Sequence, residues 1–429
     1  MKSSIEASLI EDFTHPIRDV LWGHIYMTGK FAALTESASF LRLNRIMQLG
    51  SVCLVYPGAT HTRASHSIGV YHIGKRLLQN LIQRGASQWL THEGAKSFLA
   101  ACLLHDLGHF PYTHSLKELS LLSHEALSAA IILKDPMRTL VSATGADPEL
   151  VAAIIDKEIN NQGTELLFYR KLLSGALDPD KLDYLNRDAR YCGVPYGAQD
   201  VDFILSRLYP NKTRGVDIDS RLIPNVEAVL FSKYLMYRTV YWHKQVRAAT
   251  AMVKKALING LESGYLTSEE LYNLDDNSLF TLIKSKNKIK KELSSDLVDA
   301  VFEGRIFITA AEISCKNTGI IGPRNADLWD IKKRAKLEEQ VAALLRADGL
   351  EISGEDLIID IPEPVSFETG LYILDEECYF NDSSSAFNTK TVNAFIQTLF
   401  TIRLFINQKF KEIIKTFPQI CSILDKVTQ

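Results

Sequence analysis

The spacing of apolar residues restricts the fold of this chain more than any other feature. Between about residues 40 and 134, apolar side chains recur at intervals of three and four, as at Leu77 and Leu81. That period belongs to one buried face of an α-helix. Breakers near Pro57 and Gly108 divide the stretch. The pattern therefore predicts consecutive helices that share a core.

Two further helices are predicted from their ends and their spacing. Asp178 suits an N-cap and Pro179 suits the first helical position, so a helix is expected from there to about Tyr191, closed by Gly193. Helical spacing of apolar and aromatic residues continues over a long stretch further on. It predicts a single helix over Val226–Leu261.

The pattern changes beyond about residue 262. Arg305–Ile313 and Asp356–Ile361 are rich in β-branched and apolar residues and predict strands, and a helical tail is expected from Thr391. A chain of 429 residues also exceeds the usual size of one domain. The expected fold is mainly α, with a helical domain over residues 1–261 and a smaller mixed α+β subdomain over residues 262–429.

The charge balance argues against a protein that binds polyanions over its whole surface. The formal net charge is -3 and charged residues make up 23% of the chain, so any polyanion site must be local. The basic stretches Lys284–Lys291 and Lys332–Lys336 are most simply solvated helix faces. Their alternative role is a site for nucleic acid or an effector.

The cysteines favour a reducing, cytoplasmic compartment. All six are scattered, without a CxxC pair or the spacing of a disulfide framework. The N-terminal segment MKSSIEASLIEDF carries acidic residues where a secretion signal needs an apolar core, and the sequence has no run of 18 apolar residues. We therefore expect no association with a membrane.

Histidines are concentrated in one part of the helical region. Eight of the eleven lie between His61 and His124. Singly, each is explained as a core or surface histidine of a helical domain. Jointly they indicate a site, because His105 and Asp106 enter the segment Leu99–Gly108, which is otherwise apolar. Burying both without a partner costs several kcal/mol, and a divalent metal ion would pair with both.

Four sequence blocks give this cluster a family resemblance. They are, in chain order, RASHSIGVYHIG, LLHDLGHFPYTH, SHEA and LDPDKLDYLNRDARYCG. Together they resemble the HD superfamily of phosphohydrolases, particularly its deoxynucleoside triphosphate triphosphohydrolase branch. The resemblance covers roughly residues 13–250.

The resemblance implies four metal ligands, at His66, His105, Asp106 and Asp180. Two imidazoles and two carboxylates suit Mn, Fe, Zn or Ni and leave positions for water and a phosphate oxygen, while Mg is the ion expected with the triphosphate. Asp180 also has an alternative explanation, as a first-turn carboxylate that complements the helix dipole.

The same resemblance implies acid and base groups at His109, His114, His124 and Glu125. His109 would share the face of the HD pair if that helix continues past the following glycine. Adjacent residues on a helix do not face each other, so Glu125 is expected to orient His109 rather than His124. The alternative is that His124 and Glu125 simply begin a helix capped by Ser123.

Cations for a triphosphate are implied at Arg63, Lys181, Lys233 and Lys244. Close relatives carry arginine at the position of Lys233, and lysine keeps the charge but loses bidentate geometry. Taken singly, each of these side chains is also explained as a solvated surface residue. Their positions relative to the metal motifs favour the phosphate role.

Contacts to the nucleoside are implied on the helix that follows Pro179. Asp180, Tyr184 and Asp188 are spaced by four and so form one line along it. By resemblance, Tyr184 packs against the sugar where a 2′-hydroxyl would lie, and Asp188 and Gln48 contact the 3′-hydroxyl and the ring. Tyr241, in the block YRTVYWHK, belongs to the same site. Plain helix packing is the alternative for Tyr184.

The reaction implied is hydrolysis of a deoxynucleoside triphosphate to deoxynucleoside and tripolyphosphate, by a metal-activated water that attacks the α-phosphorus. Assembly into a homodimer or homotetramer is expected with it. Two alternatives remain: a hydrolase of nucleoside monophosphates or other phosphoesters, and a regulator that binds nucleotides or nucleic acid without turnover.

The sequence departs from the resembled branch at the site where animal members bind an activating nucleotide. Animal members of the branch bind such a nucleotide through an acid and an arginine, and the corresponding stretch ESASFLRLNR offers Glu36 and Asn44. The arginine that reads guanine is missing. Arg42 or Arg45 is the candidate to replace it.

Overall fold

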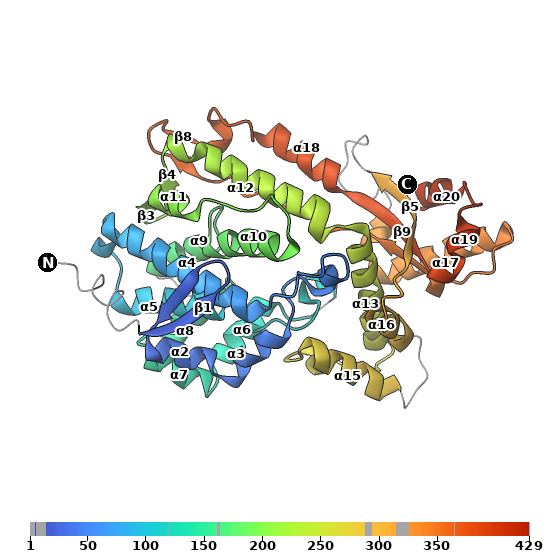
Figure 1. Ribbon diagram of the computed structural model, residues 1–429, viewed down its shortest axis with the longest axis horizontal. Coiled ribbons are helices and arrows are strands. Elements are labelled where there is room, and N and C mark those ends of the chain that lie inside the picture. The colour runs from blue at the N-terminus through green and yellow to red at the C-terminus, as the bar shows by residue number, and fades with distance from the viewer. Residues whose placement is uncertain are drawn as a thin grey trace.

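The computed structural model describes Ile5 and residues 14–119, 121–160, 164–287, 294–314, 326–363 and 365–428. A large helical body occupies one end of the molecule, and a smaller lobe built on the C-terminal sheet occupies the other (Figure 1). The predicted fold class, mainly α with a smaller mixed part, is confirmed. The N-terminal segment MKSSIEASLIEDF lies outside the described residues, except for Ile5. Cys315 also lies outside them.

The helical body begins with a β-hairpin, β1 (His15–Asp19) and β2 (Gly23–Met27), which lies against the helices (Figure 1). Its helices are α2 (Gly29–Thr35), α3 (Ala38–Arg42), α4 (Arg63–Gln83), α5 (His92–Leu104), α6 (His124–Ile132), α7 (Met137–Ala143), α8 (Pro148–Ile155), α9 (Thr164–Leu173), α10 (Pro179–Cys192), α11 (Val201–Ser206) and α12 (Ile223–Met236).

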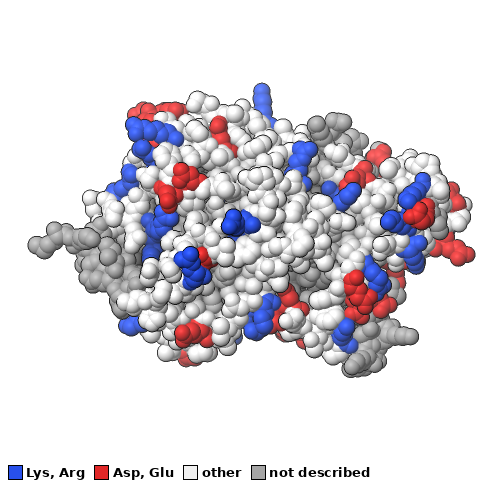
Figure 2. Space-filling model, viewed as in Figure 1, with Lys and Arg blue, Asp and Glu red and all other residues white. Residues whose placement is uncertain are grey.

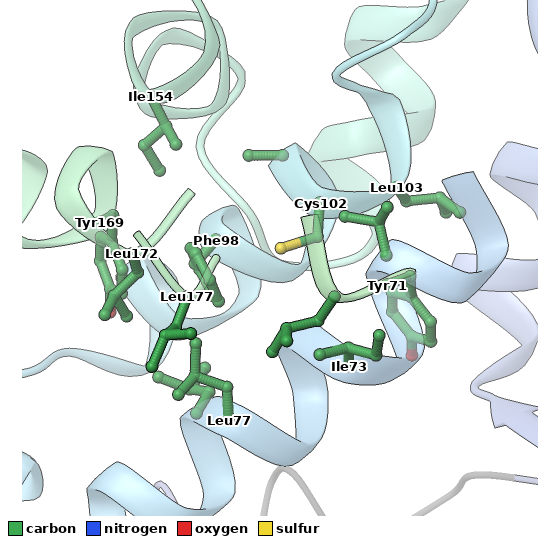
Figure 3. Packing of buried hydrophobic residues seen from close by; sticks show 14 of the residues in the cluster. Tyr71, Ile73, Leu77, Phe98, Cys102, Leu103, Ile154, Tyr169, Leu172 and Leu177 are labelled. Atoms are coloured by element: carbon green, nitrogen blue, oxygen red, sulfur yellow. The ribbon is translucent and has the colours of Figure 1, made fainter. Parts of the chain in front are cut away.

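The core of this body lies between α4, α5, α8 and α9. Tyr71 and Leu77 of α4 meet Phe98 and Cys102 of α5, with Tyr169 of α9 stacked on Phe98 (Figure 3). These are the positions whose three- and four-residue spacing predicted helices. The same packing fixes α4, α5 and α10 relative to one another, because α4 contacts both of the others.

The predicted helix after Asp178 is confirmed in detail. The side chain of Asp178 accepts a hydrogen bond from Lys181 N, and Pro179 is the first helical residue. The helix ends at Gly193, whose φ is 68°. Only glycine adopts that left-handed conformation without strain. Local sequence therefore determines both ends of α10.

The predicted single helix over Val226–Leu261 is wrong. The structure has α12, one π-helical turn over Tyr237–Tyr241, and a separate helix α13 (Lys244–Glu262) that begins after His243. Trp242 N donates to Tyr237 O, five residues back, which is the π pattern. Apolar spacing persists through such a turn, so periodicity alone does not reveal the break.

The smaller lobe is held by α13 and the antiparallel sheet β5-β9-β6. Its strands are β5 (Ile308–Ser314), β6 (Leu357–Asp360) and β9 (Thr401–Ile406), and its helices are α14 (Ser268–Leu271), α15 (Asp276–Asn287), α16 (Ser294–Phe302), α17 (Ile331–Ala347), α19 (Lys411–Ile414) and α20 (Ile420–Thr428). The two predicted strands are confirmed as β5 and β6.

The tail from Thr391 is helical only in part. Helix α18 (Thr389–Leu399) ends before β9, which is the central strand of the sheet. Five of the six residues of β9 are buried. A strand covered on both faces reads as a continuous apolar run without alternation, so its sequence does not distinguish it from a buried helix.

The C-terminal half of the chain also returns to the helical body. Strands β3 (Leu208–Asn211), β4 (Gly215–Ile218), β7 (Tyr372–Ile373) and β8 (Cys378–Tyr379) form one sheet, in which β4 and β7 run parallel. Phe367 and Leu399 join the core of the helical body. The proposed division between residues 261 and 262 stays a prediction.

Surface charges of both signs are interspersed on the face shown in Figure 2. Lys284 lies on α15 and Lys332 on α17, and both are exposed, as expected for solvated helix faces. Residues 288–291 of the first basic stretch lie outside the described residues. Among the helices that are described, none is both long and apolar enough to cross a membrane.

Candidate metal centre

Four side chains from three helices converge at one point in the helical body. His66 lies on α4, His105 and Asp106 follow the last residue of α5, and Asp180 lies in the first turn of α10. Ligand atoms of His66, His105 and Asp106 lie within 4.8 Å of one another. Asp180 Oδ1 lies 2.9 Å from His66 Nε2 and 3.9 Å from His105 Nε2. The structure thus brings together all four residues that the resemblance selected.

The donor set fits a divalent cation. His105 Nδ1 lies 3.0 Å from the carbonyl oxygen of Cys102, which fixes the proton on Nδ1. Its Nε2 is then a lone-pair donor, and it is buried without a hydrogen-bond partner among the described residues. An orphaned imidazole nitrogen next to two carboxylates is the arrangement that a metal ion satisfies.

The charges at the centre are those of a cation site. Burial alone would raise the pKa of Asp106, but its neighbours, with Arg63 2.8 Å away among them, outweigh that effect and hold the pKa well below its usual value. Burial would likewise lower the pKa of His66, yet its hydrogen bonds to Asp180 and Asp183 raise it to about 10. Without a metal, a proton on His66 therefore supplies positive charge that a bound ion would supply.

A buried network behind His66 sets the orientation of its ring. Asp183 Oδ2 lies 2.9 Å from His66 Nδ1, and both carboxylate oxygens of Asp183 accept from Arg187. Arg187 is fully buried and also donates to Asp19 of the hairpin, while Trp22 Nε1 donates to Asp183 Oδ1. A carboxylate on the far nitrogen of a metal-ligating histidine fixes its tautomer and raises its basicity.

Sequence reasoning missed this network. One signal was available, the spacing of four between Asp183 and Arg187, which places an acid and a base on one face of α10. A second was Gly69 in the interior of α4. A Cβ there would lie 1.9 Å from Asp183 Oδ1, so the network needs a glycine at this position.

The predicted acid and base groups form a cluster beside the metal centre. The ring of His109 lies 3.9 Å from that of His124 and 4.8 Å from that of His114, measured between centroids. His109 Nε2 lies 3.3 Å from Asp106 Oδ1, which joins the cluster to the centre. Glu125 Oε2 lies 3.1 Å from His124 Nδ1, so the expectation that Glu125 orients His109 is wrong. Both side chains bend toward each other from the first turn of α6.

His109 is held neutral. It is buried, and burial, reinforced by Arg63, lowers its pKa well below the usual value. Neither of its ring nitrogens has a hydrogen-bond partner within the part of the chain that the structure describes. For His124, burial lowers the pKa, and Glu125 opposes that effect only in part. The cluster therefore presents a neutral imidazole next to one that a carboxylate supports.

The loop that carries the HD pair leaves the helix at once. Helix α5 ends at Leu104, so the condition under which His109 would share a helix face with His105 is not met. A Cβ on Gly108 would lie 2.2 Å from the carbonyl oxygen of His124. Ser128 of α6 donates to the carbonyl of His105 and accepts from Gly108 N. This close approach brings α6 and its histidine to the metal centre.

Three of the four predicted phosphate cations lie near the centre. Arg63 Nη1 lies 2.8 Å from Asp106 Oδ2, and Lys181 Nζ lies 2.6 Å from Asp178 Oδ2. Lys233 and Lys181 both approach Glu368, at 3.4 Å and 3.7 Å. Lys244 is exposed and lines a separate cavity of about 420 Å³ beside the sheet of the smaller lobe. The structure does not place it with the others.

Three of the residues predicted to contact a nucleoside, Asp188, Tyr241 and Gln48, are linked through Asp188 and His61. Asp188 is buried, with Oδ1 2.8 Å from His61 Nε2 and Oδ2 accepting from the Tyr241 hydroxyl at 2.5 Å. Gln48 N donates to His61 O, and its buried Oε1 has no partner among the residues described. Tyr184 is half-buried. His61 was noted only as one of the clustered histidines, and the structure shows that it holds Asp188.

Comparison with known proteins decides the family. The HD domain model matches residues 63–188, and the HD associated region model matches residues 205–394. The uncharacterized protein MJ1154 of Methanocaldococcus jannaschii is 30% identical over 367 residues, which cover 84% of this chain and 72% of that protein. This chain belongs to the HD-domain superfamily.

Other matches agree with this HD-domain assignment. The uncharacterized protein YwfO of Bacillus subtilis is 32% identical over 64% of this chain, and the match covers 66% of YwfO, slightly under two thirds. Deoxynucleoside triphosphate triphosphohydrolase SAMHD1 of Danio rerio is 24% identical over 73% of this chain and 54% of its own. A crystal structure of a hypothetical protein from Aquifex aeolicus, at 23% identity, has a TM-score of 0.71 and covers 94% of this chain and 99% of its own, which shows the shared fold.

The two family models divide the site between them. The HD model spans all four candidate metal ligands, whereas Lys233, Tyr241 and Glu368 fall in the HD associated region. In this HD-domain protein the associated region therefore closes the side of the centre where the lysines lie.

The two arginines proposed to replace the guanine-reading arginine, Arg42 and Arg45, both contact other parts of this HD-domain protein. Arg42 is buried and donates to the carbonyl oxygens of Leu107, His109 and Leu274. It braces the loop that carries the HD pair, so the idea that it reads guanine is wrong. Arg45 Nε lies 2.5 Å from Asp275 Oδ2.

Proposed function

We propose that this HD-domain protein is a divalent-metal-dependent phosphohydrolase that converts deoxynucleoside triphosphates to deoxynucleoside and tripolyphosphate. The observation that carries the proposal is the orphaned, buried Nε2 of His105, which faces His66, Asp106 and Asp180 beside a cluster of histidines. Hydrolysis of a phosphoester needs a cation, a source of protons and a site for phosphate, and each has candidates here.

The cation would be held by His66, His105, Asp106 and Asp180, a set that suits Mn, Fe, Zn or Ni. The chemistry supplied by such an ion is polarisation of a phosphate oxygen and activation of a water molecule. Arg63 braces Asp106 and presents further positive charge to a phosphate bound beside it.

Proton movement is assigned to the histidine cluster. The new bond joins water oxygen to the α-phosphorus, and the bond that breaks joins that phosphorus to the 5′-oxygen. His109 is neutral and accepts a proton, and His124, supported by Glu125, gives one to the departing 5′-oxygen. His114 is exposed beside both rings and is placed to exchange protons with solvent.

Substrate contacts are assigned from the same geometry. Lys181 and Lys233 would bind the distal phosphates, and Tyr184, Gln48, Asp188 and Tyr241 would contact the sugar. The similarity to the deoxynucleoside triphosphate triphosphohydrolase SAMHD1 of Danio rerio, at 24% identity, supports a triphosphate substrate. A cytoplasmic location and a homodimer or homotetramer complete the proposal, and the free cysteines of the described residues agree with a reducing compartment.

The test is a product assay. Purified protein is incubated with each of the four deoxynucleoside triphosphates and Mn or Mg, and the products are separated by anion-exchange chromatography. The expected products are deoxynucleoside and tripolyphosphate, and the variant Asp106→Ala should lose both bound metal and turnover. Release of monophosphates, or turnover only of monophosphates or cyclic nucleotides, would establish a different phosphohydrolase. A rise in thermal midpoint with nucleotide but without product would indicate a regulator.

A further inference from the structure

The two largely buried lysines proposed to bind distal phosphates already have an acidic partner from a distant part of the chain. Lys233 Nζ donates to the carbonyl oxygen of Ser366 at 2.7 Å and lies 3.4 Å from Glu368 Oε2. Lys181 Nζ lies 3.7 Å from the same carboxylate oxygen. A single carboxylate therefore interacts with both lysines.

The position of Glu368 is determined by anchors on either side. Residues 361–363 follow β6 of the smaller lobe, and residues 365–371 lead into β7, which pairs with β4 of the helical body. Phe367 is buried in the main core and its ring lies 5.5 Å from Lys233 Nζ. The segment that crosses the lysines is thus attached at both ends, and Glu368 is held beside them.

The lysines have little freedom to move away from this carboxylate. Their side chains are 9% and 14% exposed, for Lys233 and Lys181, whereas the side chain of Glu368 is 41% exposed. Lys181 also pairs with Asp178. Two carboxylates therefore balance two lysines in the free protein, and Glu368 is the one among the two lysines and itself that is most exposed to solvent.

A phosphate and the Glu368 carboxylate compete for the same positions. An oxyanion that contacts both lysines would lie within a few ångströms of Glu368 Oε2, where like charges repel and solvent screens them only in part. Displacement of Glu368 leaves two lysines with one carboxylate, so the site gains positive charge only when the acidic side chain leaves.

We propose that Glu368 is an internal competitor for the distal-phosphate site: its carboxylate occupies the Lys181–Lys233 pair in the free protein and must be displaced when a polyphosphate binds. This inference rests on the proposed function, since that function makes the two lysines phosphate ligands. It assigns Glu368 a part in substrate selection, because only a ligand with phosphates beyond the metal centre has to displace it.

The test measures binding of inorganic tripolyphosphate to the full-length protein by titration calorimetry. Glu368→Gln keeps the shape of the side chain and removes the charge, and it should bind tripolyphosphate roughly threefold to tenfold more tightly than wild type. Orthophosphate should bind both proteins alike. Glu376→Gln is the matched control, because Glu376 is exposed in the turn between β7 and β8 and its removal changes the net charge by the same amount.

Lys233 should be required for the gain in affinity for tripolyphosphate. Adding Lys233→Met to Glu368→Gln should return the affinity to the wild-type value or below. Affinity of Glu368→Gln that equals or falls below wild type, or an equal gain in Glu376→Gln, would overturn the inference. If the thermal midpoint shows that Glu368→Gln does not fold, Glu368→Ala provides a second variant that also removes the charge.

The outcomes separate this inference from the proposed reaction. Hydrolysis of triphosphates without a gain in Glu368→Gln leaves the reaction standing and refutes the competitor. A gain that depends on Lys233, without any triphosphate turnover, supports the competitor and refutes the reaction.

Discussion

Each imidazole at the metal centre commits its two nitrogens to different tasks. His105 uses Nδ1 on a backbone carbonyl and His66 uses Nδ1 on Asp183, so both point Nε2 at the same place. Which nitrogen binds a metal is therefore decided by the partner of the other. The metal-binding nitrogen of His66 therefore depends on the carboxylate of Asp183.

Asp183→Asn should weaken metal binding, and it should also lower the stability, because buried Arg187 loses one of its two carboxylate partners. The amide keeps the size of the side chain but removes the charge that holds the His66 ring and its tautomer, so metal affinity should fall about 10- to 100-fold. Metal content after dialysis against graded chelator concentrations measures this change. Asp202→Asn, which touches only the surface pair with Arg76, is the control and should bind metal like wild type.

Acid stability should depend on His72, one of the clustered histidines that proves to be structural. It stacks on Trp22, and burial, reinforced by Arg76 and Lys75, lowers its pKa to about 4. A depressed pKa means that the folded state favours the neutral ring, so its contribution to stability is complete above about pH 6.5 and is lost as the pH falls toward 4.

His72→Gln should therefore lose less stability on acidification than wild type. Between pH 7 and pH 4 the difference in the free energy of unfolding should reach about 2–3 kcal/mol, measured by urea denaturation. Equal loss in both proteins would show that the ring is accessible to protons in the folded state.

At the scale of elements, close packing of α6 against the loop after α5 joins the acid–base cluster to the metal centre. Gly108→Ala would place a Cβ 2.2 Å from the His124 carbonyl oxygen and 2.5 Å from Ser128 N, and backbone atoms of α6 cannot turn aside. We expect a loss of about 1–3 kcal/mol in the free energy of unfolding and weaker metal binding. Gly370→Ala, where a Cβ meets nothing within 4 Å, is the control for denaturation and metal titration.

At the scale of the whole molecule, α13 holds the smaller lobe onto the helical body. Arg247 of α13 pairs with both carboxylate oxygens of Asp360, at the end of β6, and both side chains are largely buried. Residues 361–363 leave from that point, and Glu368 lies beside the lysines further along the chain. The ion pair therefore determines where the segment that carries Glu368 begins.

Arg247→Ala should destabilise the protein by about 3–5 kcal/mol, because it leaves the Asp360 carboxylate buried and unpaired. Thermal unfolding followed by calorimetry measures the loss. Lys415→Ala breaks an exposed pair with Glu412 and should leave the stability close to that of wild type. Similar effects for the two variants would contradict the role assigned to Arg247.

The sequence alone predicted most of the local elements and selected the candidate metal ligands. Apolar spacing predicted the helices of the core, and Asp178, Pro179 and Gly193 determined the ends of α10, because these signals act within a few residues. The order of the histidine and aspartate motifs selected the four residues that the structure brings together. The break before α13 and the buried strand β9 were not predicted. Apolar patterns indicate which residues are buried, but they do not show whether the backbone there is helical or extended.

Only the tertiary structure decided the partners of those residues. Trp22 reaches Asp183 across 161 positions of sequence and Lys233 reaches Glu368 across 135. Arg42 turned out to brace the HD loop, and Lys244 lies at another cavity. Hydrogen bonds and ion pairs of this kind depend on distances of a few ångströms between segments, and no local pattern encodes such distances because they arise when the helices pack.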